Sequence, residues 1–483
     1  MERTGTNGQP PDRPYWLQRI CVAGMAAGVG ALLLSKFGLI PLPPWGVFST
    51  MLILIVLGNV LCWAWADRWL ARYLDGWRCR SWRLVHGAFF IFAIALLGTV
   101  FAVGRDFFDA LPIALIMWVL SWNLIVFCLA VVLTGLELVR FLVGVFFSIF
   151  TLPLAKSVTS KVSGCPPDRL AESGDCAKKV DPSVRLSRRA LLARSAMLTP
   201  VLLSGGFVAG GLYQADRFVV RRISLKLPRL PDRLRGLTIT HLSDLHVGRL
   251  FRPEHLSAMV EASNKLGSDL VAITGDILDH SNDFLPAAAE AISQLEHRYG
   301  RFLVIGNHDL IDDPRMMLSY LDAREPNLLC DRMKPMEIGG ERVRIAGLFW
   351  SRYEHPRGND PGHVGRVEAT LGRLADRDTP VGSLVPPVEQ EPFTIGLVHH
   401  PHAFDALADR GVDLTLAGHT HGGQVMLTPP GWSERIGAGN LLFRYLWGEY
   451  RRGDSLLYVN AGVGNWFPLR VNAPAEIVQL RLI

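Results

Sequence analysis

Five short apolar runs in the second half of this 483-residue chain end in residues that can bind a metal ion or move a proton. The runs lead into Asp244-Leu245-His246, Gly275-Asp276, Gly306-Asn307-His308-Asp309, His399-His400-Pro401 and Gly418-His419-Thr420-His421-Gly422-Gly423-Gln424. Short apolar runs that alternate with helical patterns are typical of an α/β domain. Because ligand sites in such folds lie beyond the carboxyl ends of the strands, we expect these side chains to meet at one edge of a sheet.

The types of donor atom favour a pair of transition-metal ions. Two Asp, one Asn and several His side chains suit Mn²⁺, Fe or Zn²⁺ better than Ca²⁺, which prefers oxygen ligands only. No cysteine lies among these segments, which argues against a closed structural zinc site. The donors are too many for one four-coordinate ion, and the glycines before Asp276, Asn307 and His419 let the backbone approach the ions closely.

In this order the five segments resemble the calcineurin-like metallophosphoesterases. The tail from Gly462 to Glu476, together with Gly423-Gln424, resembles the membrane-anchored, exported bacterial branch of that family. The resemblance covers roughly residues 235–483, and five segments in family order are a strong signal where one would be weak. It implies two packed β-sheets flanked by helices and a phosphoesterase that depends on two divalent ions, with Mn²⁺ favoured and Fe or Zn²⁺ as alternatives.

The resemblance also implies a role for each residue. The first metal would be held by Asp244, His246 and His421, the second by Asn307, His399 and His419, and Asp276 would bridge both. His308 would act as general acid or transition-state stabiliser, and Asp309 would orient it by accepting a hydrogen bond from its ring. His400 is the alternative to His399 at the second metal. Water would attack phosphorus directly, with no covalent phospho-enzyme.

Other polar residues have a plainer interpretation. Taken singly, Asn307 and Asp309 are common turn formers. The residues expected to be ordinary rim or surface groups are His241, Asp279, His280, His363 and His402. Arg249 and Arg470 are expected either to contact a substrate phosphate or to be exposed without such a role. Phe349-Trp350 stands where relatives often carry an Asp, which leaves any substrate contact there in doubt.

The first half of the chain has the composition of a membrane region. Hydrophobic residues make up 49% of the chain and charged residues 19%, and the apolar excess lies before residue 215. Apolar stretches at 16–35, 45–66, 84–104, 111–135 and 195–213 each approach the ~20 residues of a spanning helix. A shorter run, 141–155, either extends the fourth helix or lies at the membrane surface.

These patterns predict four segments along the chain. Residues 1–155 form a membrane region of about four transmembrane helices, and residues 156–194 form a basic cytoplasmic linker. Residues 195–213 form a fifth transmembrane helix or a twin-arginine-like anchor, since Ser187-Arg188-Arg189 precedes them. Residues 216–483 form the phosphoesterase domain.

The basic residues predict the orientation. They are concentrated before the first span, between the second and third, and in the linker, so these parts are expected in the cytoplasm. Five spans then place the C-terminal domain on the periplasmic or extracellular side of a bacterial inner membrane. The net charge of +6 comes largely from these connections, so nucleic-acid binding is the minor interpretation.

The expected function is hydrolysis of phosphoester or phosphoanhydride bonds at the outer face of the membrane. Proximity to the lipid bilayer favours a lipid-linked or amphiphilic phosphorylated substrate. One alternative is a broad phosphodiesterase or phosphatase that acts on soluble nucleotides. The other is a non-catalytic metal-binding module of a membrane assembly or transport protein.

Overall fold

The computed structural model describes most of the C-terminal half and three long helices of the N-terminal half. The described residues are 16–36, 44–70, 113–151, 209–349, 392–429, 435–441, 443–465, 467 and 469–483, with single positions between 77 and 95 and residue 206. The chain divides into two compact units, Met1–Gly206 and Phe207–Ile483.

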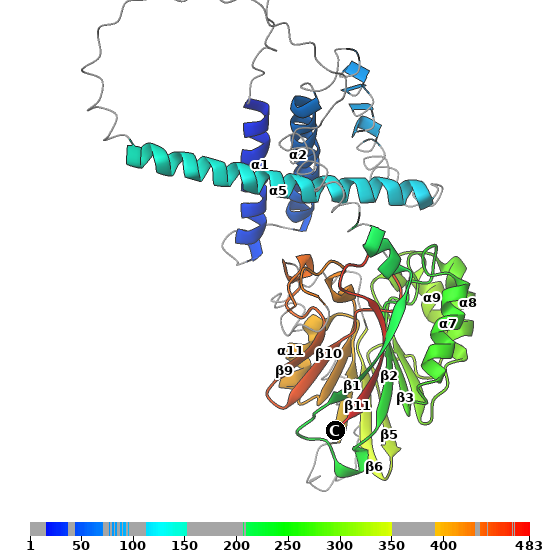
Figure 1. Cartoon of the computed structure of the whole chain (residues 1–483). Coiled ribbons are helices and arrows are strands. Elements are labelled where there is room, and N and C mark those ends of the chain that lie inside the picture. The colour runs from blue at the N-terminus through cyan, green and yellow to red at the C-terminus, as the bar shows by residue number, and fades with distance from the viewer. Residues whose placement is uncertain are drawn as a thin grey trace, which may run out of the picture. The chain divides into compact units, whose positions relative to one another are not determined.

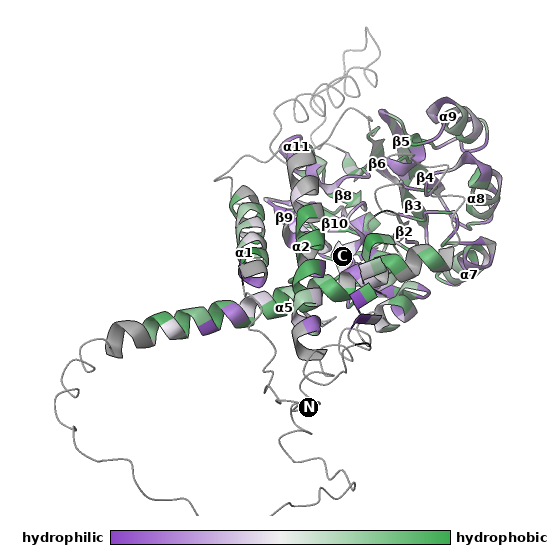
Figure 2. Cartoon of the chain, turned by 90° about the horizontal axis from the view of Figure 1, so that it is seen from above, coloured by the Kyte–Doolittle hydropathy of each residue, from purple (hydrophilic) through white to green (hydrophobic). Residues whose placement is uncertain are grey.

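The N-terminal unit is built on the helices α1 (Trp16–Lys36), α2 (Pro44–Leu70) and α5 (Ile113–Thr151). The first two lie side by side and α5 runs across both, and all three are mainly hydrophobic (Figure 1, Figure 2). Gly24 and Gly28 of α1 allow the close approach of leucines of α2, because an added Cβ would lie 2.8 Å from Leu57 or Leu54. Asn59 donates a buried hydrogen bond to Asn123 at 3.2 Å.

These helices coincide with part of the predicted membrane region. The first two helices match the first two predicted spans, and α5 joins the fourth span and the 141–155 run into one helix that continues through Glu137. Among the described residues, one stretch, Ile125–Phe146, is long and apolar enough to cross a bilayer, while Gln18–Leu32 and Ile53–Asp67 are shorter. Most of the third span, residues 156–194 and residues 195–205 lie outside the described residues, so the multi-span arrangement stays a prediction.

The C-terminal unit contains two β-sheets, as predicted. The first has the strand order β1-β11-β2-β3-β4, with β1 (Phe218–Leu225), β11 (Ala475–Leu482), β2 (Thr238–Leu242), β3 (Leu270–Thr274) and β4 (Gly300–Val304). The second has the order β5-β6-β7-β8-β10-β9, with β5 (Arg332–Ile338), β6 (Glu341–Gly347), β7 (Phe393–Leu397), β8 (Leu414–Ala417), β10 (Ser455–Val459) and β9 (Gly448–Arg452).

The two sheets pack face to face and helices cover their outer faces, which confirms the predicted α/β architecture. Mainly aliphatic side chains of both sheets, together with Phe302, form the core between them, including Ile239, Ile395 and Leu416. The helices α7 (Pro253–Asn264), α8 (Leu285–Ser293) and α9 (Pro314–Asp322) lie on one side, and α11 (Phe404–Asp409) on the other (Figure 1). Because β3, β7 and β8 are covered on both faces, all of their residues are buried.

The strand directions bring several loops to one edge of the sandwich. The strands β2, β3 and β4 are parallel, and β6, β7, β8 and β10 are parallel in the second sheet. We call the edge formed by the carboxyl ends of β2, β3 and β4 the carboxyl edge. Since β11 is antiparallel to β2 and parallel to β1, the chain also enters the domain at this edge. Residues 209–215, which precede β1, are helical.

Candidate metal centre

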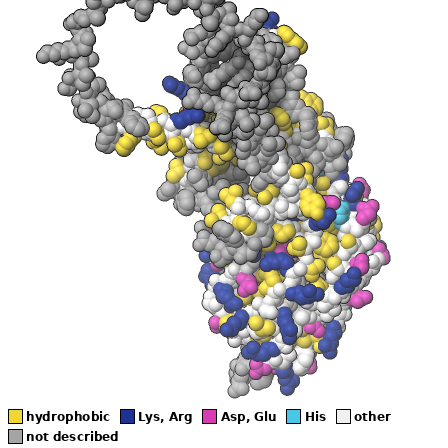
Figure 3. Space-filling view, in the orientation of Figure 1, with side chains coloured by type: hydrophobic (Ala, Val, Ile, Leu, Met, Phe, Trp, Pro, Cys, Tyr) yellow, Lys and Arg dark blue, Asp and Glu magenta, His cyan; other side chains and the backbone are white. Residues whose placement is uncertain are grey.

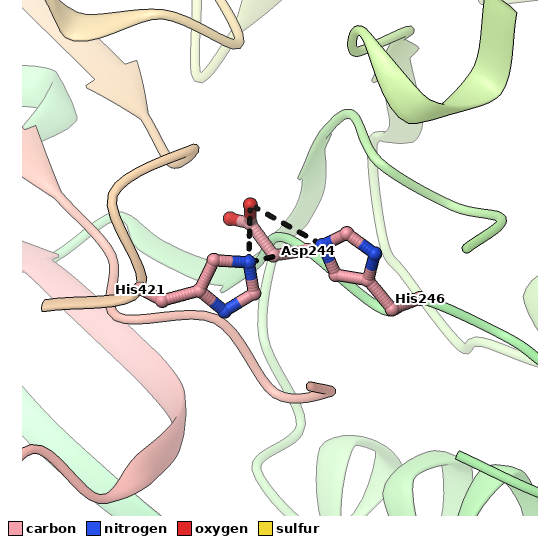
Figure 4. Close-up of side chains that lie close together, drawn as sticks. All are labelled: Asp244, His246 and His421. Carbon is pink, nitrogen blue, oxygen red and sulfur yellow. Dashed lines mark hydrogen bonds and ion pairs between the residues drawn. The ribbon is translucent and has the colours of Figure 1, made fainter. Parts of the chain in front are cut away.

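Three side chains from loops far apart in the sequence meet at the carboxyl edge. Asp244 and His246 follow β2, and His421 follows β8 (Figure 4). His421 Nε2 lies 3.3 Å from Asp244 Oδ1 and 2.9 Å from His246 Nε2. All three residues are buried, with 2% exposure or less. Together they form the first of three groups whose donor atoms lie within 4.8 Å of one another.

Asp276, directly after β3, belongs to both of the other two groups. One group contains His246, Asp276 and His308, and the other contains Asp276, His399 and His419. Asp276 Oδ2 lies 3.5 Å from His246 Nε2 and 3.2 Å from His399 Nε2. The carboxylate of Asp276 therefore stands between the residues expected at the first metal and those expected at the second.

The second set of expected ligands also comes together. Asn307 Oδ1 lies 3.1 Å from His399 Nε2, and His419 Nδ1 lies 3.1 Å from the same nitrogen. His400 points elsewhere: its Nδ1 lies 2.9 Å from His402 Nδ1, and its ring packs on His419. Of the two neighbouring histidines, His399 thus directs a ring nitrogen to Asp276.

The backbone at the ligands adopts an unusual conformation. Asp244, His246, Asp276, His419 and His421 all have positive φ angles, between 47° and 72°. Such angles are uncommon outside glycine and cluster at functional sites, where the surrounding structure must hold them. Two glycines make the room, as their positions in the sequence led us to expect: a Cβ on Gly306 would collide with Asp276 Oδ1, and one on Gly418 with Asp244 Oδ2.

The electrostatics of the cluster suit bound cations. Burial raises the pKa of Asp276, but His399 and His308 outweigh that effect and hold it well below its ordinary value. Burial lowers the pKa of His399, yet Asp276 and Asp244 raise it to about 9. Buried carboxylates therefore need positive charge beside them, which a divalent ion supplies more strongly than a histidine. The converging donors, all of them O or N, fit such ions.

The ring nitrogens that face away from the centre fix the tautomers of two histidines. His399 Nδ1 donates to the Thr274 carbonyl at 2.8 Å, and His246 Nδ1 lies 3.3 Å from Asp279 Oδ1. In the neutral rings Nε2 then carries a free lone pair directed at the centre, which is the form that binds a metal ion. Asp279, expected to be an ordinary rim residue, therefore supports a ligand, and only its place three residues after Asp276 hinted at it.

The expected pairing of His308 with Asp309 is wrong. His308 Nδ1 donates to the carbonyl of Asp279 at 2.6 Å, and Asp279 Oδ1 lies 3.7 Å away. The Asp309 carboxylate instead accepts hydrogen bonds from the amides of Leu278 and Gly306, both at 2.8 Å. Asp309 follows Asn307 in a tight turn, so its side chain folds back onto the backbone. It fixes the loops that carry Asp276 and Asn307.

Neither interpretation offered for Arg470 holds, because this residue is fully buried. Its guanidinium donates to the carbonyls of Ala461, Gly464 and Ala473 at 2.7–3.1 Å. Its Nη2 also lies 3.1 Å from His421 Nδ1. Burial, His246 and Arg470 together hold the pKa of His421 well below its ordinary value, so the ring is uncharged. Arg470 thus ties together the backbone at Ala461, Gly464 and Ala473 behind His421.

With this geometry established, comparison with known proteins identifies the family. The family model described as calcineurin-like phosphoesterase matches residues 237–423, a range that includes every expected metal ligand. The C-terminal domain belongs to this family. As a member of this family, the domain is a metal-dependent phosphoesterase.

Curated metallophosphoesterases are similar to this chain over about 60% of its length. An uncharacterized metallophosphoesterase of Helicobacter pylori is 29% identical over 301 residues, which cover 62% of this chain and 73% of the relative. The metallophosphoesterase YkuE of Bacillus subtilis is 28% identical over 62% of this chain and 98% of its own length. A transmembrane protein with metallophosphoesterase domain from Danio rerio is 28% identical over 60% of this chain and 67% of its own.

Proposed function

We propose that the protein is a two-metal hydrolase of phosphoester or phosphoanhydride bonds that acts on a lipid-linked or amphiphilic substrate at the outer face of the bacterial inner membrane. The position of Asp276 carries the first part of the proposal. Its carboxylate has two oxygens and lies between two sets of donor atoms, so it is suited to bridge two ions. Asp244, His246 and His421 would hold the first ion, and Asn307, His399 and His419 the second.

The bound ions would lower the pKa of a shared water and stabilise negative charge on the phosphoryl oxygens. The donor set suits Mn²⁺, and Fe or Zn²⁺ are also compatible with it. The protein's own residues would fix the geometry, because five of the seven expected ligands have positive φ angles that the surrounding structure must hold. Substrate would approach the side where Asn307, His308 and His419 are partly exposed.

His308 is the residue placed to move a proton. Since a carbonyl can only accept, the bond to Asp279 keeps a proton on Nδ1 of His308. A second proton on Nε2 makes the ring cationic, able to neutralise a phosphoryl oxygen or to protonate a leaving group. Burial lowers the pKa of His308, so the cationic form depends on a bound phosphate nearby.

The membrane location is supported by two observations. The Danio rerio relative is named a transmembrane protein, and Ile125–Phe146 of this chain is long and apolar enough to span a bilayer. The basic connections between the apolar runs favour a cytoplasmic N-terminus and an exported C-terminal domain. Protease added to intact spheroplasts should digest the C-terminal domain, and inside-out vesicles should protect it. Protection in spheroplasts would contradict the outer-face location.

The activity is tested on the full chain in detergent, stripped of metal and then given Mn²⁺. Hydrolysis of bis-(p-nitrophenyl) phosphate should depend on the added ion and be lost in Asp276→Asn, because the bridging carboxylate would be gone. Asp232→Asn is the matched control, since this aspartate side chain is 93% exposed. A folded chain that binds Mn²⁺ but hydrolyses no ester would identify a metal-binding module instead.

A further inference from the structure

The chain enters the phosphoesterase domain beside the metal centre. The last helical turns before β1, residues 209–215, are bonded to the segment that carries Arg470. Arg470 N donates to the carbonyl of Gly211 at 3.0 Å, and Asn472 N donates to Gln214 Oε1 at 3.1 Å. Gly211 is also in tight contact with Leu469, since an added Cβ would lie 2.5 Å from that side chain. This entry point is therefore a fixed part of the domain.

Next to the entry point is a ladder of two short segments that exposes large apolar side chains. Leu427 N donates to the carbonyl of Ile436 at 2.7 Å, and Met426 pairs with Gly437. Leu427 is 73% exposed and Ile436 is 50% exposed. Met426 N in turn donates to the carbonyl of Val471 at 2.9 Å. This ladder follows the ligand His421 and is joined through Val471 to the same segment as residues 209–215.

Tyr213 is a third exposed apolar residue, in the helical turns that are bonded to the same segment. It is 60% exposed, and Arg217 lies over its ring at 4.2 Å. An aromatic ring with a neighbouring arginine is typical of the boundary between lipid and water. We call Tyr213, Leu427 and Ile436 the apolar rim. The opposite edge of the sandwich differs, with Asp232, Arg233 and Arg235 exposed near the first turn of the domain.

We propose that the apolar rim lies in the lipid–water interface, so that the metal centre faces the bilayer and takes its substrate from the membrane surface. The sequence supports lipid as the occupant, because the apolar run 195–213 ends at Tyr213 and so leads directly into the rim. On the face seen in Figure 3, hydrophobic side chains gather toward the upper end of this domain, and charged side chains cover its lower end.

The part that concerns substrate rests on the proposed function. An amphiphile in the outer leaflet presents its phosphate at the headgroup level, and its acyl chains stay in the bilayer. A rim held about 5–10 Å deep would place the carboxyl edge at that level without removing the substrate from the membrane. A soluble phosphoester would need no such orientation.

The contact is tested with the full chain in phospholipid vesicles. The seven cysteines are replaced by serine, and a bimane fluorophore is attached to Leu427→Cys or Ile436→Cys. Ile483→Cys is the matched control, an apolar residue 40% exposed at the opposite edge. Lipids with brominated acyl chains should lower the emission at least about twofold at positions 427 and 436, because an interfacial side chain reaches the acyl boundary, and should leave position 483 unchanged. Equal quenching at all three positions would overturn the contact.

A second measurement in the native background keeps the proposal testable if the cysteine-free chain does not fold. The readout is the ratio of two turnover rates, that on an acylated aryl phosphodiester in the vesicle over that on bis-(p-nitrophenyl) phosphate. Leu427→Glu and Ile436→Glu should each lower this ratio by about tenfold, because a charge in the interface weakens docking. Ile483→Glu should leave the ratio unchanged, and an unchanged ratio in all three variants would overturn substrate entry from the bilayer. Quenching at positions 427 and 436 without hydrolysis of either ester would instead contradict the proposed function and still support the contact between the apolar rim and the bilayer.

Discussion

The two groups of expected metal ligands differ in how completely the protein encloses them. Asp244, His246 and His421 are at most 2% exposed. The second group contains Asn307 and His419, which are partly exposed, and His308 beside them is 24% exposed. Asp276 lies between the two groups, near His246 of the first and His399 of the second.

The supporting contacts differ in the same direction. The first group is backed by the carboxylate of Asp279, the guanidinium of Arg470 and the amide of His419, which donates to both oxygens of Asp244 at 3.0 Å. These contacts leave little room for water to replace a ligand. We infer that an ion at the first group would be held as part of the fold, while one at the second group would exchange with solvent and meet the substrate.

Removing one ligand from each group gives the largest expected effect and the most direct test of this difference. Asp244→Asn and Asn307→Ala should each lower turnover of a soluble phosphodiester by more than about 100-fold, since the loss of a mere supporting partner already costs up to that much. Excess Mn²⁺ should restore part of the activity of Asn307→Ala only, because water can fill the vacated position there. Metal content and turnover are measured together, and equal recovery in both variants would contradict the difference.

Replacing Arg470 tests whether the support behind the first group is structural. Arg470→Ala should lower the free energy of unfolding by about 3–5 kcal/mol, because three buried carbonyls lose their donor. Arg298→Ala, on a side chain 71% exposed, is the control and should change it by less than about 0.5 kcal/mol. Pulse proteolysis of the full chain in detergent measures both, and a similar small loss in each would show that the buried guanidinium adds little.

Replacing Asp279 should affect the first ion alone. Asp279→Asn keeps the size of the side chain and the carbonyl that accepts from His308, but removes the charge near His246 Nδ1. The Mn²⁺ concentration for half-maximal activity should rise about 10–100-fold, with a smaller change in turnover at saturating ion. The control Asp232→Asn should shift neither value. A lower turnover with unchanged dependence on Mn²⁺ would mean that Asp279 acts through His308 instead.

The alternation of strand-like runs and helical patterns in the second half of the chain predicted an α/β domain, and the resemblance to the calcineurin-like family implied its two packed sheets. It did not predict that β1 pairs with β11, about 250 residues further along the chain. Pairing between distant segments depends on which faces are buried together, and no local pattern records that. The position of the chain entry beside the metal centre follows from this pairing, so it became visible only in the structure.

The candidate site could also be predicted only in part. The sequence correctly predicted that the residues after the strands lie close together, because the carboxyl ends of parallel strands share an edge. The residues behind them were misjudged. Arg470 was expected either to contact a substrate phosphate or to be exposed, because arginine is seldom buried without partners. Its partners are backbone carbonyls that no sequence motif marks. Asp309 follows a histidine in sequence, but the tight turn directs its carboxylate to amides.

The smallest expected effect comes from replacing a histidine inside the first sheet. The replacement shows whether the loss of folding stability in acid arises in the protein interior or at the metal centre. His241 is fully buried in β2, where its Nε2 lies 2.9 Å from Thr274 Oγ1, and burial lowers its pKa to about 3. In the unfolded chain the pKa of His241 returns to its ordinary value of about 6.5. Acid therefore protonates the unfolded state before the folded state, and the free energy of unfolding falls as the pH drops through 6.5. Between pH 7 and 5.5 this one residue should cost about 1.3 kcal/mol. His241→Gln, which retains an amide for Thr274, should reduce the pH dependence of unfolding of the metal-stripped chain by that amount. An unchanged slope in this variant would place the acid sensitivity of the metal-stripped chain at the histidines and carboxylates of the metal centre instead.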